Sequence, residues 1–271
     1  AAELGHEVTV MAPAYPGHDA KADDTLPFRV VRFGFKPGHL SRMLYLLWVC
    51  LNIDTKKYDI VHAADWMFAV ALHTLWPLKK ILFVATVHGT DIYIMDSLNL
   101  VTKLRGKKFF EHALRVACNS AYTKNLAKQY HSYIPDEKLV VTHLGVNKWW
   151  NEAAQDVPAC LQRHGIPADR KILLTIARLD VRKGHLLTLK ALSLLPAALK
   201  AQLAYVIVGK TTDPAYQEKL LEESKKTGLP VIFTGSVEAD DVKSLYRAAW
   251  MHCMLGEKHP QKVEGFGLSY L

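Results

Sequence analysis

The sequence contains no apolar run of the ~20 residues that a membrane-spanning helix requires. The longest candidate, residues 43–53, is short and is interrupted by Asn52. The four cysteines lie far apart without C-x-x-C spacing, which argues against a zinc site and against a disulfide framework. We therefore expect a soluble, cytoplasmic chain whose cysteines pack as small apolar side chains in a reducing compartment.

The sequence also lacks low-complexity tracts, short repeats and a D-x-D metal motif. Its acidic pairs, Asp23–Asp24 and Asp240–Asp241, fall in a predicted loop and in the first turn of a predicted helix. Helix capping and the helix dipole explain acidic residues at such positions. We expect no metal ion and no other cofactor.

The formal net charge is +8 and is spread over both halves of the chain. Such a balance is typical of proteins that bind nucleic acid, an anionic membrane or a polyanionic small ligand. No nucleic-acid motif accompanies the charge, so a nucleic-acid partner is not expected. The densest cluster comprises Lys103, Arg105, Lys107 and Lys108, followed by Phe109 and Phe110. This cluster is either a solvated helix face or a weak contact with an anionic membrane surface.

The chain has 271 residues, which is long enough for two domains. Half of these residues are apolar, so two buried cores can form. Short apolar segments alternate with longer helical patterns, which predicts βαβ units and parallel sheets. Strands are expected over 59–63, 81–88, 115–120, 171–177, 204–209 and 231–235, and helices over 64–76, 103–114, 184–195, 214–228 and 239–249. We place the boundary near residue 148, which gives two Rossmann-like α/β domains, 1–148 and 149–271.

The first residues have the pattern of a helix that ends at Gly5 and is followed by a strand over Glu7–Met11. In a doubly wound domain such a helix follows a first strand and a glycine-bearing turn. Neither is present, so we expect an interior piece of a longer protein that by itself is poorly soluble and inactive. The absence of a signal peptide then says nothing about targeting.

The strongest candidate site is ARLDVRKG, in which Arg178 follows a predicted strand and Lys183 precedes the helix expected to start near Gly184. Ligands of open α/β sheets bind at the carboxyl ends of strands, where helix N-termini offer free N–H groups. Two basic residues in one loop are more often solvated surface. As a site, this loop fits a diphosphate.

Two further loops contain candidate residues. In VEGFGLSYL, glycines flank Phe266, and Glu264 offers a carboxylate to sugar hydroxyls. In TVHGTD, His88 follows a predicted strand, where it can hold a sugar hydroxyl or stabilise positive charge on the ring. Alone, the first is an ordinary strand-to-helix turn, and the second is a structural histidine.

Taken together, ARLDVRKG, EGFG, TVHGTD, GHEVTVMAP, YDIVHAADW, CNSAYTKNL and HLGVNKWW resemble the GT-B glycosyltransferases, in particular the retaining glycosyltransferase family 4. The resemblance covers nearly the whole chain, in order and in spacing. It implies two Rossmann-like domains that face each other across a cleft. It further implies transfer of a sugar from a nucleotide-diphosphate sugar to an acceptor hydroxyl, with retention and without metal.

The resemblance also assigns roles to individual residues. Arg178 and Lys183 would bind the donor diphosphate, and His88 would lie on the opposite wall. The remaining donor contacts would come from Gly184, Ser236, Val237, Glu264, Gly265, Phe266, Gly267 and Leu268. The acceptor would be a glycan or a lipid-linked sugar, since many family members work at the cytoplasmic leaflet.

The sequence departs from the family pattern at three points. Ala64 stands where many members have a second histidine, and Asp91 replaces the commoner glutamate of H-G-x-E. The second glutamate of the E-x7-E motif would follow Leu271. These departures leave the subfamily open.

Two other functions remain open from the sequence. A nucleotide-sugar epimerase of the same fold would need carboxylates placed for proton abstraction, and the matched motifs offer no such pair. A catalytically silent protein that binds nucleotide sugars would keep the fold and the donor contacts. Release of nucleoside diphosphate in the presence of an acceptor separates both from a transferase.

Overall fold

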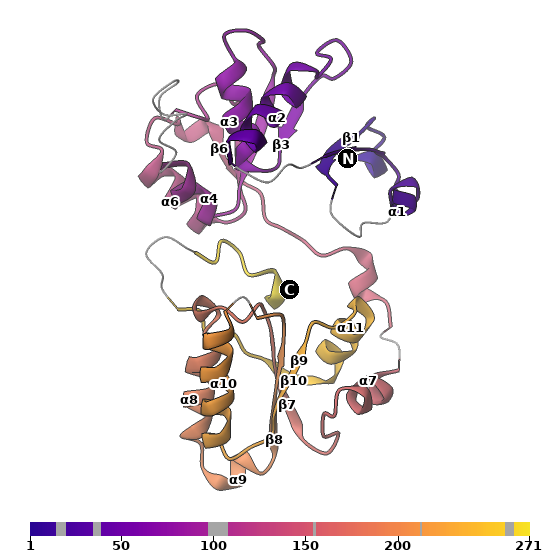
Figure 1. Cartoon of the computed structure of the whole chain (residues 1–271), viewed down its shortest axis with the longest axis vertical. Coiled ribbons are helices and arrows are strands. Elements are labelled where there is room, and N and C mark those ends of the chain that lie inside the picture. The colour runs from indigo at the N-terminus through magenta and orange to yellow at the C-terminus, as the bar shows by residue number, and fades with distance from the viewer. Residues whose placement is uncertain (15–19, 35–38, 97–107, 154–155, 212, 258–262) are drawn as a thin grey trace. The chain divides into compact units, whose positions relative to one another are not determined.

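The computed structural model describes the chain except for residues 15–19, 35–38, 97–107, 154–155, 212 and 258–262 (Figure 1). Its secondary structure alternates strands and helices, as the sequence predicts. None of the described helices combines the length and the apolar character that crossing a bilayer demands.

The elements up to residue 141 are η1 (Ala2–Leu4), β1 (Thr9–Pro13), α1 (Ala20–Asp24), β2 (Arg29–Phe33), α2 (His39–Leu51), β3 (Val61–Ala63), α3 (Trp66–Leu75), β4 (Phe83–Val87), α4 (Thr90–Asp96), β5 (Val116–Cys118), α6 (Ala121–Tyr130), η2 (Asp136–Lys138) and β6 (Leu139–Val141). Strands β1 and β2 form a parallel pair, and a second sheet has the order β3-β4-β5-β6. The helix α3 begins where the Asp65 carboxylate accepts the Met67 N–H, a typical N-cap.

The later elements are η3 (Lys148–Asn151), α7 (Val157–Arg163), β7 (Lys171–Ile176), η4 (Val181–Lys183), α8 (His185–Ser193), α9 (Ala197–Lys200), β8 (Leu203–Val208), α10 (Pro214–Lys226), β9 (Val231–Gly235), α11 (Ala239–Ala248), β10 (Ala249–His252) and η5 (Leu268–Tyr270). The strands form a parallel sheet in the order β10-β7-β8-β9. Figure 1 shows α8 and α10 on one face of this sheet and α7 and α11 on the other.

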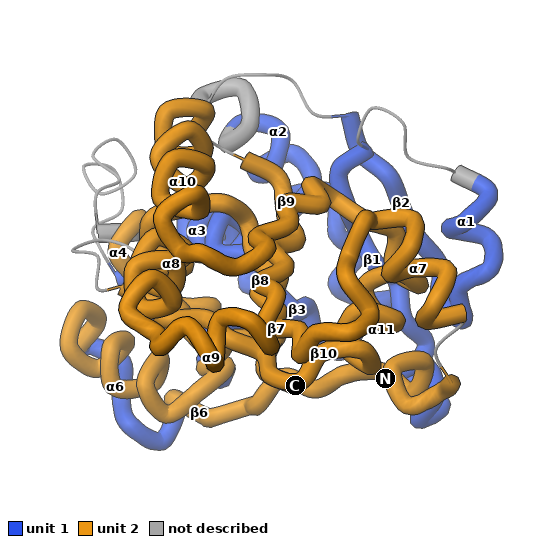
Figure 2. Tube along the Cα trace, turned by 90° about the horizontal axis from the view of Figure 1, so that it is seen from below, with its two compact units in different colours: residues 1–86, 98–116, 133–138 blue, residues 87–97, 117–132, 139–271 orange. Residues whose placement is uncertain are grey.

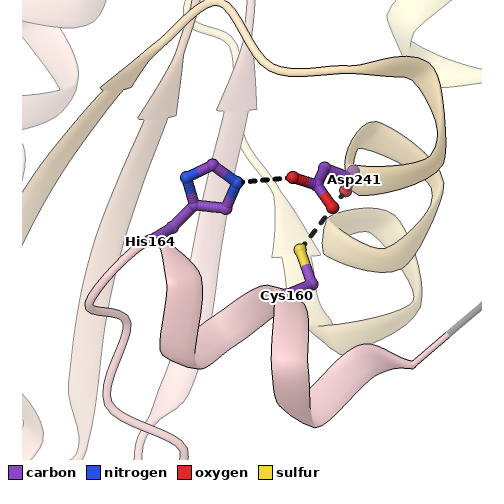
Figure 3. Close-up of side chains that lie close together, drawn as sticks. All are labelled: Cys160, His164 and Asp241. Carbon is purple, nitrogen blue, oxygen red and sulfur yellow. Dashed lines mark hydrogen bonds and ion pairs between the residues drawn. The ribbon is translucent and has the colours of Figure 1, made fainter.

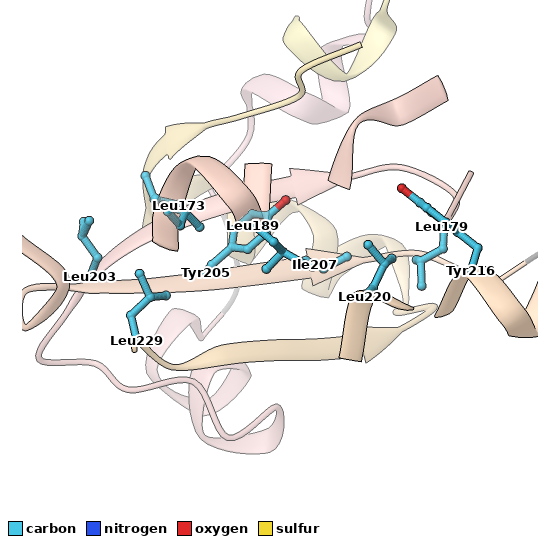
Figure 4. Close-up of a cluster of buried hydrophobic side chains, with 10 residues drawn as sticks. Leu173, Leu179, Leu189, Leu203, Tyr205, Ile207, Tyr216, Leu220 and Leu229 are labelled. Atoms are coloured by element: carbon cyan, nitrogen blue, oxygen red, sulfur yellow. The ribbon is translucent and has the colours of Figure 1, made fainter. Parts of the chain in front are cut away.

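Strand β8 is buried along its whole length and supplies two cores. Tyr205 and Ile207 point into the core beneath α8 and α10, which Figure 4 shows, whereas Val206 and Val208 point into the core beneath α7 and α11. This alternation follows from the two-residue period of a strand. It explains why the strand is an uninterrupted apolar run.

One buried hydrogen bond crosses between neighbouring strands. The Thr175 hydroxyl donates to the Cys253 carbonyl and accepts the Tyr205 hydroxyl at 2.8 Å. Thr175 and Tyr205 are fully buried, so each polar group needs the partner that it has.

By compactness the chain divides into two units, coloured separately in Figure 2. The first comprises residues 1–86, 98–116 and 133–138, and the second comprises 87–97, 117–132 and 139–271. Both units are discontinuous in sequence, because two segments of the first half, 87–97 with α4 and 117–132 with α6, belong to the second unit. The domain boundary near residue 148 stays a prediction.

The structure corrects one expectation around the basic cluster. Lys103, Arg105 and Lys107 lie outside the described residues, while residues 108–114 form turns instead of the expected helix. Phe109 and Phe110 are buried, so they cannot contact a membrane surface. Both phenylalanines pack in the core, because burial of large apolar side chains is favourable and their exposure on a loop surface is not.

Candidate functional site

The conformation of the loop after β7 is fixed by contacts of its backbone. The Asp180 carboxylate accepts the Arg182 N–H at 3.0 Å and so caps the short η4 turn. Gly184 then adopts a φ of 70°, and a Cβ there would lie 1.6 Å from the Leu255 carbonyl oxygen. Only glycine fits this position, which places Lys183 at the rim of the sheet immediately before α8.

A cluster of three charged side chains joins this loop to the glycine loop near the C-terminus. Glu264 accepts hydrogen bonds from Arg182 Nη1, at 2.6 Å, and from Lys183 Nζ, both on its Oε2 atom. Both cations are largely buried, with exposed side-chain fractions of 11% and 14%. Burial alone raises the pKa of Glu264, but the bonds and charges of Lys183 and Arg182 together lower it below the usual value.

The backbone of the glycine loop is held from its other side. The Gly265 carbonyl accepts the Ser120 hydroxyl at 2.6 Å, and the Val263 N–H donates to the Thr90 hydroxyl at 3.2 Å. A Cβ on Gly265 would lie 1.9 Å from the His88 carbonyl oxygen. The loop that presents Glu264 therefore rests directly against the loop that contains His88.

The conformation of the His88 loop depends on Asp91. The backbone N–H groups of His88 and Gly89 both donate to the Asp91 carboxylate, at distances from 2.7 to 3.0 Å. Asp91 is buried, which raises its pKa against the opposing effect of these N–H groups. Asp91 thus organises the turn, while the His88 side chain is exposed.

The other predicted site residues lie as follows. Arg178 is exposed directly after β7, and in the described part of the chain its guanidinium makes no hydrogen bond or ion pair. Ser236 is exposed after β9, whereas Val237 packs against the core beneath α7 and α11. Phe266 is half-buried beside the His143 ring, and Leu268 is half-exposed. The structure therefore brings Lys183 and Glu264 together, whereas Arg178 forms no hydrogen bond or ion pair with either of them.

Sequence reasoning missed four contributors: Arg182, Thr90, Asn119 and Ser120. Arg182 stands in the recognised ARLDVRKG motif, but a basic residue beside Lys183 resembles a second solvated charge. Ser120 and Asn119 stand in the recognised CNSAYTKNL stretch. Asn119 Nδ2 donates to the His88 carbonyl at 3.2 Å, and the Ser120 hydroxyl donates to the Gly265 carbonyl at 2.6 Å. Both partners are remote in sequence, so no local pattern indicates these contacts.

One cluster has the composition of a metal site. Cys160 of α7 and His164, the residue that follows this helix, point toward Asp241 of α11, and the candidate ligand atoms of all three lie within 4.8 Å of one another (Figure 3). However, the Arg163 guanidinium donates to both Asp241 oxygens, and the Asp241 carboxylate also bonds His164 Nε2 at 2.8 Å. Because a guanidinium already neutralises this carboxylate, the cluster is an ion-pair network that ties α7 to α11.

Residues 1–149 match the family model described as Glycosyltransferase Family 4. The chain belongs to glycosyltransferase family 4. Residues 157–271 match a second model, described as Glycosyl transferases group 1. The family resemblance stated from the motifs is thereby confirmed.

This family 4 chain is similar to a distant relative. It is 23% identical, over 265 residues, to the uncharacterized glycosyltransferase MJ1607 of Methanocaldococcus jannaschii. The alignment covers 90% of the chain and 65% of MJ1607, so the chain spans less than two thirds of that relative's length.

Solved structures show the same fold. The sucrose-phosphate synthase of Thermosynechococcus elongatus superposes with a TM-score of 0.72 at 19% identity, over 99% of this chain and 69% of the other. Anabaena Alr3699/HepE, solved in complex with UDP and glucose, gives 0.64 at 19% identity, over 88% and 63%. At this identity the likeness establishes the fold alone, which is a GT-B fold of the α/β class with parallel sheets, as the sequence predicted.

Proposed function

We propose that this chain is the core of a glycosyltransferase that moves a sugar from a nucleoside-diphosphate sugar to an acceptor hydroxyl. The observation that carries the proposal is the bond between Lys183 and Glu264. These residues match the family's diphosphate-binding lysine and sugar-binding glutamate. Here they meet at the carboxyl end of β7, where open α/β sheets bind ligands.

The solved relatives support the same class of donor. Anabaena HepE has been solved with UDP and with UDP-glucose. A nucleoside diphosphate leaves with negative charge, which Lys183, Arg178 and the backbone N–H groups at the start of α8 would compensate. We propose that these groups replace a divalent cation, that transfer retains the anomeric configuration, and that no protein nucleophile takes part.

The acceptor is proposed to be a glycan or a lipid-linked sugar, at the cytoplasmic side of a membrane. The basic residues of the 103–108 segment would supply a weak, salt-sensitive attraction to an anionic surface, without help from Phe109 and Phe110. Sedimentation with vesicles of neutral and anionic lipid tests this contact. Binding that depends neither on the anionic lipid content nor on the salt concentration would contradict this contact.

The central experiment uses the complete gene product. Thermal shift with UDP-, GDP- and ADP-sugars identifies the donor, because a ligand at 100 times its Kd stabilises the native state by about 2.7 kcal/mol. Release of nucleoside diphosphate is then measured over an acceptor panel, with and without EDTA, and NMR assigns the product anomer. Isomerised sugar without transfer would identify an epimerase, and tight donor binding without release would identify a silent binding protein.

A further inference from the structure

The Glu264 carboxylate shares its charge unevenly between its two oxygens. Arg182 and Lys183 both donate to Oε2, whereas Oε1 has no hydrogen-bond partner among the described residues. Two cations thus compensate one anion, and one oxygen stays available. If Lys183 serves a diphosphate, as the proposed function requires, its single positive charge no longer compensates Glu264 in full.

Arg182 is held more rigidly than a surface arginine. Its N–H donates to Asp180 Oδ1 at 3.0 Å, and its carbonyl accepts the Glu257 N–H at 2.9 Å. Its guanidinium is largely buried, and its Nε is buried without a hydrogen-bond partner in the described part of the chain. A planar guanidinium anchored in this way keeps one direction, whereas the Lys183 ammonium sits on a flexible stem and can change partner.

We infer that Arg182 is a positioning residue, which keeps Glu264 oriented and ionised with Oε1 facing the substrate while Lys183 moves to the donor diphosphate. This inference rests on the proposed function. The physical need is clear: once Lys183 has left, the carboxylate lies beside a dianionic diphosphate. Without Arg182, like-charge repulsion favours protonation of Glu264, and the neutral carboxyl is a weaker hydrogen-bond acceptor for the sugar hydroxyls.

The test compares Arg182→Gln, Arg182→Lys and Lys183→Gln in the complete gene product, with the exposed Arg247→Gln as the matched control for loss of one positive charge. Arg182→Gln is expected to lower kcat roughly 10- to 100-fold with little change in the donor KM. The acid limb of the kcat/KM profile should move to higher pH by roughly one unit, because Glu264 loses a compensating charge. Arg182→Lys should keep the acid limb in place, and Lys183→Gln should raise the donor KM.

A readout that needs no turnover separates this inference from the proposed function. Carbon-13 NMR of the Glu264 carboxyl should show a higher pKa in Arg182→Gln than in wild type and Arg247→Gln. Melting temperatures show whether each variant is folded. If Arg182→Gln is unfolded, Arg182→Lys is compared with wild type in its place. If Arg182→Gln raises the donor KM as Lys183→Gln does and leaves the Glu264 titration unchanged, Arg182 is a second diphosphate ligand and the inference is wrong. Absence of transfer in wild type would instead overturn the proposed function.

Discussion

The Ser120 hydroxyl donates to the Gly265 carbonyl at 2.6 Å, although the two residues lie 145 positions apart. The same hydroxyl accepts the Thr123 N–H at 3.1 Å and so caps α6. One side chain therefore fixes a helix start and the loop that presents Glu264. Stability and the geometry of the candidate site are coupled at this residue.

Ser120→Ala should lower the free energy of unfolding by about 1–2 kcal/mol, because it removes an N-cap and leaves the Gly265 carbonyl without its shortest partner. Ser120→Thr keeps the hydroxyl and serves as the control. Urea denaturation of both variants measures the difference. Equal midpoints for Ser120→Ala and wild type would show that the bond contributes nothing to stability.

Gly265→Ala should reduce kcat/KM at least ~10-fold, since its Cβ would lie 1.9 Å from the His88 carbonyl oxygen and would displace the Glu264 loop. Gly256→Ala is the matched control, because its nearest non-neighbouring atom is the Arg182 carbonyl oxygen at an ordinary 3.7 Å. Steady-state kinetics and melting temperatures are compared for the two variants. A fully active Gly265→Ala enzyme would place the reaction away from this loop.

Arg178→Ala and Lys183→Ala should each lower kcat/KM by roughly 10²–10³, about 3–4 kcal/mol of transition-state stabilisation. Under the proposed function, both cations compensate charge on the departing nucleoside diphosphate. Kinetics with saturating acceptor and varied donor measure the loss. Wild-type kinetics in both variants would remove the diphosphate role from this loop.

Stability should fall as the pH falls from about 6.5 to about 4, because burial lowers the pKa of His185 to about 4. The folded state binds its proton less readily than the unfolded state, so acid favours unfolding, by about 3 kcal/mol over this window. His185→Leu should flatten the dependence, whereas the exposed His6→Gln should not. Urea midpoints between pH 4 and pH 7 provide the measurement, and parallel curves for His185→Leu and wild type would contradict the expectation.

The sequence predicts best those elements whose environment is uniform. Strand β8 is buried on both faces, so its apolar run alone identifies it. Strand β10 was not predicted. Its Trp250 and Met251 are exposed on an edge strand, so the sequence lacks the alternation of apolar and polar residues that identifies a half-buried strand. The helix α7 was not among the expected helices, although its Pro158 stands in the first helical turn, where proline is tolerated.

The candidate site was predictable only in part, for a similar reason. Lys183 and Glu264 were found through the family motifs, and the structure shows that they are bonded. Arg182 was overlooked because its partner lies 82 residues away, and neighbouring cations on a loop resemble solvated charge. Contacts of this kind arise from the folded arrangement of strand ends and leave no local pattern.

The hydrogen bond between Tyr205 and Thr175 has a consequence for folding fidelity. Every other side chain of β8 is purely aliphatic. A shift of one residue against β7 would therefore exchange the aliphatic side chains of one core for those of the other, at little cost in free energy. It would also turn the Tyr205 hydroxyl into the opposite core and away from Thr175, leaving two buried polar groups unpaired. This pair therefore fixes the register of β8 against β7, because a shifted sheet would bury two unpaired hydroxyls. The correct register also keeps the strand ends, and the charged loops that follow them, aligned with one another.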